Sequence, residues 1–494
     1  MTSTGGAPLS SELPFTSAPT RLERPMSLLQ QAGRRHVTAL VVLFLLSIPA
    51  ITPRIYASDE VQYFAFLRSI WFDRDLSFDN EYRHFYDAGV ARTDGFRETL
   101  LEMQSDTGLR ISFATIGSAI LWAPFYAVAD AGVLMARAAG AAVPRDGYSW
   151  PYLAAVCYGS AFYGFLAVLL GVRLATAFGF DSGSSLLAGV AVWLGTPLVF
   201  YTHVAPVFAH ATSAFCVALF LTVWLKVRTD WSAAGCAGLA ATGALMMMVR
   251  EQDVSFFVAP AIDFIWYHLT RSRLDVSAAA KSLAAAAAAF ALVFLPQAIA
   301  YVVLNGHVGP PRLVSRKMNW LSPHAAQILF SPSHGLVFWT PLMLVVVAGL
   351  VLLAGRLRRA QDISVVRPGA LAVCLIAAMA AQIYLLGSLD SWTSAGAFGQ
   401  RRFVGSSSIF IVGLAAVLAS WRGGWRATAV QALVAVAVWW NLALIAQFAT
   451  GLMDRQRLEL NRNAYDAFVT VPAMAPRLAY RYLFDRSSFY QNPQ

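Results

Sequence analysis

The stretch "VTALVVLFLLSIPAITPRIYASDE" (residues 37–60) places two carboxylates directly after an apolar run. A helix of about 20 residues, rising ~1.5 Å per residue, crosses the hydrocarbon core of a bilayer, and the apolar run has roughly that length. Ionisable side chains near such a segment are costly and tend to be functional. The stretch therefore predicts a first transmembrane helix that ends at a functional surface carrying Asp59 and Glu60.

The whole chain is apolar for its length. Of its 494 residues, 57% are hydrophobic and only 13% are charged, and the mean hydropathy is +0.56. A soluble protein of this size could not bury so large an apolar share, so lipid must surround most of the chain. We therefore expect an all-α polytopic membrane protein.

The net charge of +10 suggests a nucleic-acid partner at first sight. In a membrane protein, however, excess Lys and Arg gather in cytoplasmic loops, and no basic run is interleaved with aromatic residues in an aqueous stretch. Nucleic acid is therefore excluded. The four cysteines fall inside apolar stretches and lack CxxC spacing, which argues against disulfides and thiolate metal sites.

Apolar stretches predict about eleven transmembrane helices. They lie near residues 37–56, 150–173, 184–203, 206–227, 232–250, 254–270, 279–304, 335–355, 369–388, 403–421 and 427–448. With a cytoplasmic N-terminus, this count puts the basic loops on the cytoplasmic side, as the positive-inside tendency requires. A twelfth apolar stretch, 110–138, would reverse that arrangement if it crossed, so we expect it to be interfacial or re-entrant.

This topology divides the chain into three parts. Residues 1–36, rich in Ser, Thr, Pro, Gly and Arg, predict a disordered cytoplasmic tail, and the apolar run that follows is expected to be retained rather than cleaved. Residues 37–448 form the membrane domain, in which 57–149 is an extended first external loop with juxtamembrane helices. Residues 449–494 form a short external tail. The polar loops then share the external face of the plasma membrane.

Asp59 and Glu60 allow two interpretations. "SDE" is a common helix start, because acidic side chains near a helix N-terminus stabilise the helix, so both residues could simply cap a helix at the interface. Alternatively, one of them acts as a general base that takes a proton from an acceptor hydroxyl.

Two further segments raise the question of a metal ion. "DRDLSFDNEYRHFYD" (73–87) resembles the opening of a calcium loop, but Phe78 and His84 stand where the glycine and the bidentate glutamate should be. A solvated acidic loop is favoured over a divalent-cation site. His203 and His210 lack an evident third ligand, so polar lining of a cavity is favoured over a metal site there.

Two external stretches offer candidate anion-binding residues. In "REQD" (250–253), the charged residues could neutralise one another at the interface, or Arg250 could reach an anionic ligand. In "FSPSHGLVFWTP" (330–341), His334 lies near the start of a helix, and such a position suits either an anion or a simple cap.

The stretch "DSWTSAGAFGQRRFVG" (390–405) is the most informative external segment. Trp392 offers aromatic surface, while Arg401 and Arg402 open the next helix. Positive charges at an external helix start oppose both the helix dipole and the positive-inside tendency. We therefore expect a compensating negative group, and a phosphate fits because arginine binds it with two hydrogen bonds.

Four stretches in this order resemble the polytopic C-type (GT-C) glycosyltransferases, the superfamily of protein O-mannosyltransferases and the bacterial transferases that put aminoarabinose on lipid A. The resemblance is spread over most of 37–410. The stretches are "SDEVQYFAFLRS", "TGLRISFATIGSAILWAPFY", "LFSPSHGLVFWTP" and "SWTSAGAFGQRRFVG".

The resemblance implies a reaction at the external membrane face. A sugar carried on a polyprenyl phosphate is transferred to a hydroxyl of a glycan, lipid or protein acceptor, and the lipid phosphate leaves. Asp59 matches the catalytic carboxylate, with Glu60 in support, and Arg401 or Arg402 matches an arginine that contacts donor phosphate. Some members require a divalent cation and others do not. At 449–494 we expect a short external tail where many members have a large soluble C-terminal domain.

Two other classes of function stay open. A transporter or flippase of a lipid-linked or anionic substrate would also need arginines in a cavity, but it predicts an inverted repeat with broken helices in both halves. A purely structural membrane scaffold would leave the clustering of polar residues on one face unexplained. The sequence has no Walker loop, Rossmann fingerprint, HExxH or GxSxG motif, so ATP-driven transport and the common hydrolase chemistries lack support.

Overall fold

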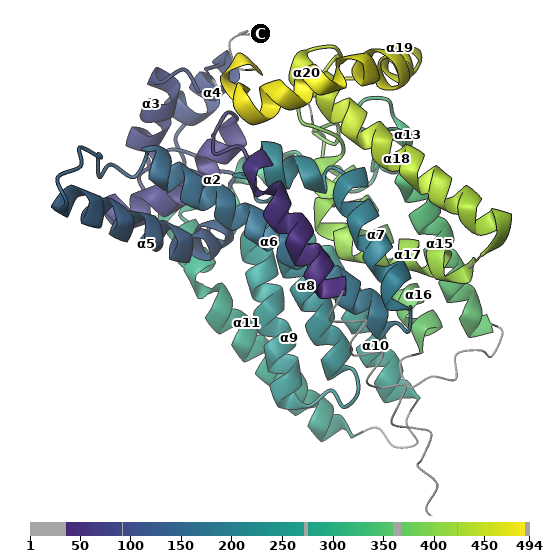
Figure 1. The fold of residues 1–494 in the computed structure, drawn as a ribbon. Helices are drawn as coiled ribbons and strands as arrows, with labels where there is room; N and C mark the ends of the chain where they lie inside the picture. The colour runs from purple at the N-terminus through teal and green to yellow at the C-terminus, as the bar shows by residue number, and fades with distance from the viewer. Residues whose placement is uncertain are drawn as a thin grey trace, which may run out of the picture.

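The computed structural model describes residues 36–90, 92–270, 275–358, 367–394, 396–421 and 423–489. Within these ranges the chain is helical and forms no β-strand (Figure 1). The expected all-α architecture is therefore confirmed. The predicted N-terminal tail lies outside the described residues, apart from His36.

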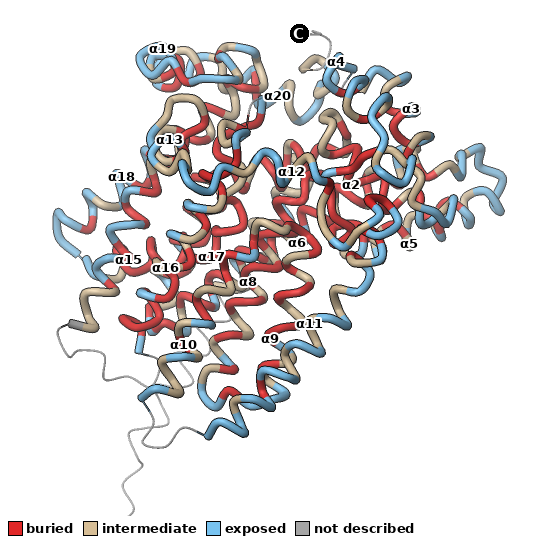
Figure 2. The backbone as a smooth tube through the Cα atoms, turned by 180° about the vertical axis from the view of Figure 1, so that it is seen from behind, coloured by how far each residue is buried: buried red, intermediate tan, exposed pale blue. Residues whose placement is uncertain are grey.

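A bundle of apolar helices makes up most of the molecule. Its members are α6 (Trp150–Ala177), α7 (Ser182–Gly195), α8 (His210–Val227), α9 (Ala233–Val249), α10 (Val258–Leu269), α11 (Val276–Asn305), α15 (Leu342–Arg358), α16 (Pro368–Gly387), α17 (Ser407–Ser420) and α18 (Gly424–Thr450). Helices that are apolar on all sides need either a protein core or lipid around them. In Figure 2 the buried positions run through α6, α8 and α17, whereas α11 and α18 expose much of their length.

α17 is the centre of the bundle. It packs against α6, α7, α8 and α15 and is buried almost from end to end. The approach to α15 is close because both helices carry glycine there: a Cβ added to Gly349 would lie only 1.8 Å from the carbonyl oxygen of Gly413. Small residues at such crossings let membrane helices pack backbone to backbone.

Seven helical segments in the described ranges are long and apolar enough to cross a membrane. They are α5 (Gly117–Ala138), α6, α8, α11, α16, the segment Arg401–Ser420 and α18. Four expected spans correspond to shorter apolar helices, at His36–Ala50, Ser182–Gly195, Ala233–Val249 and Leu342–Leu357. The expected span near 254–270 contains the twelve-residue α10. The multi-pass character is thus supported, while the count of eleven stays a prediction.

α5 lies differently from its neighbours. It packs against α2 (Ser58–Arg68), α6 and α9, and in Figure 1 it runs across the end of the bundle while α9 and α11 run along it. This direction fits the interfacial placement expected for 110–138, although α5 also has the length and composition of a span.

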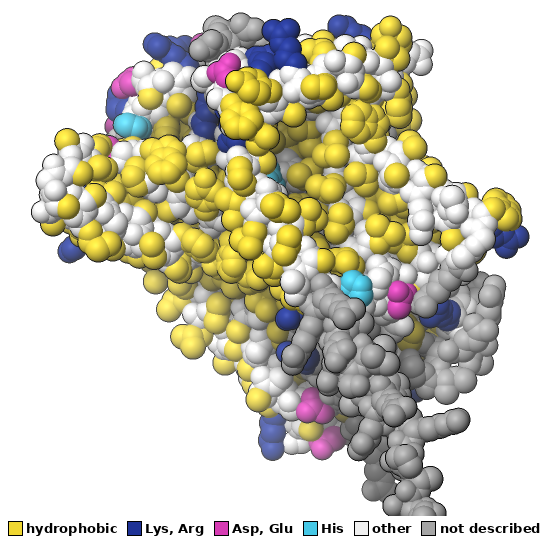
Figure 3. All heavy atoms as spheres, viewed as in Figure 1, with side chains coloured by type: hydrophobic (Ala, Val, Ile, Leu, Met, Phe, Trp, Pro, Cys, Tyr) yellow, Lys and Arg dark blue, Asp and Glu magenta, His cyan; other side chains and the backbone are white. Residues whose placement is uncertain are grey.

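A layer of short helices covers one end of the bundle, and we call it the cap layer. It consists of α2, α3 (Asp79–Asp87), α4 (Asp94–Phe96), α5, α19 (Leu460–Tyr465), η7 (Asp466–Thr470), α20 (Val471–Phe484) and η8 (Arg486–Phe489). Figure 1 shows the C-terminal part of this layer lying across the bundle end. On the face shown in Figure 3, hydrophobic side chains cover the middle of the molecule, and most charged side chains lie above and below them.

The C-terminal segment is fastened to the chain that leaves the first helix. Arg486 donates to the carbonyl oxygens of Ile51 (2.6 Å) and Pro49 (2.7 Å), and the Tyr482 hydroxyl donates to the carbonyl oxygen of Ala50 (2.8 Å). These three bonds form what we call the C-terminal clamp. It fixes the backbone that leads into α2.

Candidate functional site

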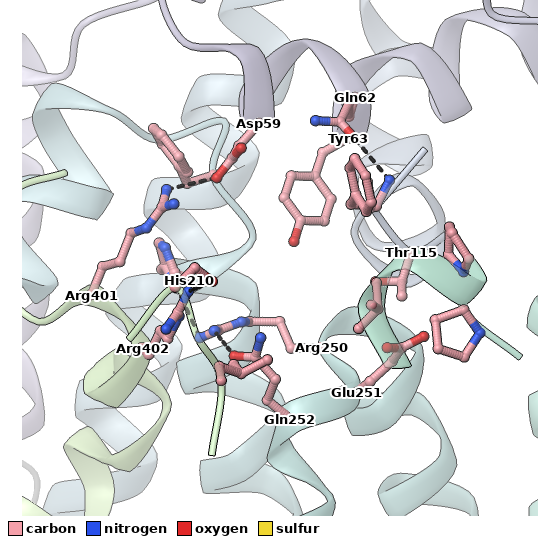
Figure 4. A pocket seen from close by; sticks show the side chains of 18 of the residues that line it. Asp59, Gln62, Tyr63, Thr115, His210, Arg250, Glu251, Gln252, Arg401 and Arg402 are labelled. Carbon is pink, nitrogen blue, oxygen red and sulfur yellow. Dashed lines mark hydrogen bonds and ion pairs between the residues drawn. The ribbon is translucent and has the colours of Figure 1, made fainter. Parts of the chain in front are cut away.

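A polar cavity of about 350 Å³ lies between the cap layer and the bundle (Figure 4). Its walls come from α2, from residues 113–115, 208–210 and 250–252, from the end of α11 with the segment that follows, and from residues 389–402. Among the described lining residues, the cations are Arg250, Lys317, Arg401 and Arg402, and the carboxylates are Asp59 and Glu251. The cavity therefore brings together Asp59, Arg250, Arg401, Arg402 and His210, all of which were candidates from the sequence.

Asp59 and Arg401 form an ion pair in this cavity. Arg401 Nη1 lies 2.7 Å from Asp59 Oδ2, and both side chains keep some access to solvent, 18% for the arginine and 40% for the aspartate. The Arg401 guanidinium also lies over the ring of Phe208, 5.1 Å from its centre. Asp59 sits in the first turn of α2, where the helix dipole stabilises a carboxylate.

Arg402 is a half-buried cation without an anionic partner among the described residues. Its Nη2 donates to the Ser391 hydroxyl (3.1 Å), whereas its Nη1 is buried and makes no hydrogen bond. An unmade hydrogen bond from a charged donor is expensive. A ligand oxygen in the cavity would satisfy it.

Arg250 ends α9 and is held by neutral groups. Its Nη1 donates to Nδ1 of His210 (3.1 Å), and its Nη2 donates to Oε1 of Gln252 (2.7 Å). Because arginine can only donate, Nδ1 of His210 accepts, which places the imidazole proton on Nε2. The guanidinium thus lines the cavity with its positive charge unpaired within the described structure.

Glu251 is not neutralised by Arg250, although the two are adjacent. Its carboxylate forms no hydrogen bond or ion pair with any described residue, and burial raises the pKa of Glu251 to about 7. The third charged residue of this segment, Asp253, accepts a hydrogen bond from the Ser213 hydroxyl (2.6 Å). Mutual neutralisation, one of the two readings of "REQD", is therefore not what the structure shows.

Glu60 lies away from the cavity and caps the helix. Its Oε2 accepts from the backbone N–H groups of Tyr56 (2.9 Å) and Ala57 (3.1 Å), and burial raises the pKa of Glu60 to about 8. The two carboxylates of the opening stretch have therefore separated: Asp59 faces the cavity, and Glu60 holds the start of α2.

His334 and Trp392 are likewise not among the described lining residues. The Nε2–H of His334 donates to the carbonyl oxygen of Ala397 (2.8 Å), and the side-chain amide of Gln400 donates to the carbonyl oxygens of His334 (3.0 Å) and Trp392 (3.1 Å). These bonds fix the loop that ends at Arg401. The helix after His334 has only four residues, so both predicted binding residues act on the site through the loop.

His203 belongs to a second, largely apolar cavity of about 490 Å³ between the first helix, α7 and α18. Its ring nitrogens lie 2.8 Å from the Thr202 hydroxyl and 3.0 Å from the Ser47 hydroxyl. His203 and His210 thus line different cavities, and both serve as polar lining.

The acidic segment 73–87 is held by internal bonds. Asp79 pairs with Arg83 (2.6 Å) and Arg110 (2.7 Å), and Asp73 pairs with Arg68. The described part of the chain contains no group of three or more His, Cys, Asp or Glu side chains placed to hold a metal ion.

Gln62, Tyr63 and Lys317 are polar lining residues that were not predicted from the sequence. Gln62 and Tyr63 follow Asp59 at i+3 and i+4, so one face of a helix carries all three, and this spacing could have identified them. Burial raises the pKa of Tyr63 to about 12, so its hydroxyl keeps its proton. Lys317 carries no comparable signal in its local sequence.

No protein-family model, curated protein or solved structure matches this chain.

Proposed function

We propose that this chain is a membrane glycosyltransferase of the GT-C kind, which transfers a sugar from a polyprenyl-phosphate-linked donor to an acceptor hydroxyl. The observation that carries the proposal is the placement of Asp59 in one cavity with Arg250, Arg401 and Arg402. A carboxylate beside a group of arginines supplies both a base and a binding site for a phosphate leaving group.

The charge balance of the cavity supports an anionic ligand. Four described cations line it against two carboxylates, and Arg402 Nη1 lacks a partner. A phosphate between Arg401 and Arg402 would accept hydrogen bonds from both guanidinium groups. Such charge-assisted bonds are strong, and they strengthen further where water is scarce.

The chemical step then needs one proton transfer, the formation of one bond and the breaking of another. The acceptor oxygen attacks the anomeric carbon of the sugar, and the bond from that carbon to the phosphate oxygen breaks with both electrons going to the phosphate. Asp59 takes the proton of the acceptor hydroxyl. The arginines stabilise the charge that develops on the leaving phosphate.

The Asp59–Arg401 ion pair suggests an order of binding. A donor phosphate competes with Asp59 for Arg401, because both are anions at the same guanidinium. Donor binding therefore frees the carboxylate for the acceptor. We infer that the donor binds first. We also infer that donor and acceptor meet at the external face of the membrane.

A transporter or flippase of a lipid-linked anion is the alternative. The surplus of arginines serves it equally well, since it too must bind a phosphate. A transporter, however, gives no role to Asp59, the carboxylate that shares the Arg401 guanidinium with the ligand.

Mass spectrometry of lipids with the detergent-solubilised protein separates these functions, with wild type beside Asp59→Asn. Consumption of a glycosyl polyprenyl phosphate by wild type alone would support the transferase and identify Asp59 as the base. Binding without consumption by both proteins would support the transporter.

A further inference from the structure

The polar cavity has two chemically different sides. In Figure 4, Arg401 and Arg402 lie on one side, and Glu251 lies on the other, beside Thr115. Tyr63 projects between them from α2. A ligand with an anionic end and a neutral polar end would meet a different partner at each end.

Glu251 presents free acceptors to the cavity. Its backbone neighbour Arg250 is bound to His210 and Gln252, and the nearby Thr115 hydroxyl is used in a 2.8 Å bond to the carbonyl oxygen of Val249. No described residue therefore donates to the Glu251 carboxylate. Glu251 is half-buried, so its carboxylate oxygens are accessible from the cavity and can accept hydrogen bonds from a ligand.

Tyr63 offers a second free group, between the two sides of the cavity. Its hydroxyl forms no hydrogen bond with a described residue, although it lines the cavity. A phenol donates and accepts, and a carboxylate accepts at both oxygens. Together they match the hydroxyl groups of a sugar, which donate and accept in the same way.

We propose that Glu251 and Tyr63 bind the sugar of the donor while the arginines bind its phosphate, so that Glu251 selects an uncharged glycosyl group and rejects one that carries a carboxylate. This inference rests on the proposed function, because it assigns the sugar end of the same donor. Above the Glu251 pKa of about 7, a uronic acid would bring a second carboxylate beside an ionised one in a half-buried site, and the two like charges would repel.

Binding measurements test the assignment independently of catalysis. The full-length protein in detergent is titrated with polyprenyl phosphate, with a polyprenyl-phosphate hexose or pentose, and with a polyprenyl-phosphate hexuronic acid. The variants are Glu251→Gln, Tyr63→Phe and a control, Glu98→Gln, at an exposed glutamate outside the cavity. We expect Glu251→Gln to weaken binding of the neutral glycosyl lipid about tenfold, which corresponds to one charged hydrogen bond.

The pattern across the three probes decides the matter. Glu251→Gln should leave the unglycosylated lipid within about twofold of wild type and should improve binding of the hexuronic acid. Equal weakening of the glycosylated and unglycosylated lipids, or no change in either, would overturn the inference. Selective binding of the neutral glycosyl lipid without transfer would uphold it and overturn the proposed transferase. If wild type binds none of the three probes, both fail.

Discussion

Asp59 Oδ2 and Arg401 Nη1 lie 2.7 Å apart, and together they join the first turn of α2 to the start of the segment that leads into α17. The pair holds the proposed base against one of the proposed phosphate ligands. Removal of either partner therefore affects both proton transfer and phosphate binding, and to a different extent in each variant.

Asp59→Asn should reduce transfer at least about a hundredfold, because a positioned general base contributes that much or more. It should also bind polyprenyl phosphate at least as tightly as wild type, since Arg401 loses its internal competitor. Transfer assays and lipid titration on the same preparation check both expectations. Transfer at the wild-type rate by Asp59→Asn would contradict the assignment of Asp59 as the general base.

Arg402→Ala should lower donor use by about a hundredfold, the usual cost of one donor lost from a developing oxyanion. Arg402→Lys should recover only part of this, because lysine keeps the charge but lacks the planar fork. Steady-state kinetics with varied donor report the change. Arg462→Ala, at a side chain 64% exposed and outside the cavity, serves as the control, and equal losses in both alanine variants would contradict the assignment.

Glu60→Gln should remove a pH dependence of stability. Burial raises the pKa of Glu60 from 4.5 to about 8, so the folded chain holds this proton more tightly than the unfolded chain. The stabilisation is therefore present below pH 4.5 and is lost as the pH rises through about 8, by at most about 1.4 kcal/mol per pH unit.

The measurement is thermal unfolding in detergent between pH 5 and 9 (the window set by those pKa values). The melting temperature of wild type should fall across this range more steeply than that of Glu60→Gln. Parallel curves for the two proteins would show that Glu60 keeps the same proton affinity on unfolding.

Arg486→Ala should loosen the C-terminal clamp. The change leaves the backbone carbonyls of Pro49 and Ile51 without their donor. Pro49 is exposed, so water can replace the bond there, whereas the unmade bond at the buried Ile51 costs about 1–3 kcal/mol. We expect a lower melting temperature and faster proteolysis after residue 460. Arg477→Ala, at an exposed position of the preceding helix α20, should change neither. A normal melting temperature in Arg486→Ala would show that the clamp carries no stability.

The expected sidedness can be checked by thiol labelling, because the four native cysteines are all buried and give a silent background. A membrane-impermeant maleimide applied to intact cells should label Ala141→Cys, at an exposed position just after α5, and should spare Thr229→Cys, after the far end of α8. Reversed labelling would place the polar cavity on the cytoplasmic side.

The sequence predicted which segments meet at the cavity, because topology alone brings loops on one face together. The sequence could not predict which of two adjacent side chains enters the cavity. Asp59 and Glu60 are neighbours on a helix, so they point about 100° apart, and only one can face the cavity. Arg250 has an extended backbone (φ −152°, ψ 116°), so it and Glu251 project to different sides.

Two other predicted residues, His334 and Trp392, do not line the cavity. His334 and Trp392 were chosen because their stretches carry glycine, aromatic and polar residues, yet those residues build the loop before Arg401 rather than the wall. The direction of a side chain within an irregular loop depends on tertiary hydrogen bonds, which a local window of sequence does not contain. The common helical face of Asp59, Gln62 and Tyr63, in contrast, could be predicted from their spacing, because the period of an α-helix is regular.

The C-terminal clamp can form only late in the synthesis of the protein. Arg486 binds the carbonyl of Ile51 across a separation of 435 residues. At ~5–20 residues per second, a ribosome needs roughly 20–90 s to cover that distance. Throughout that interval the first helix is already available for membrane insertion, while the segment that fastens it has not been made. The segment between the first helix and α2 therefore stays unfastened until η8 has left the ribosome.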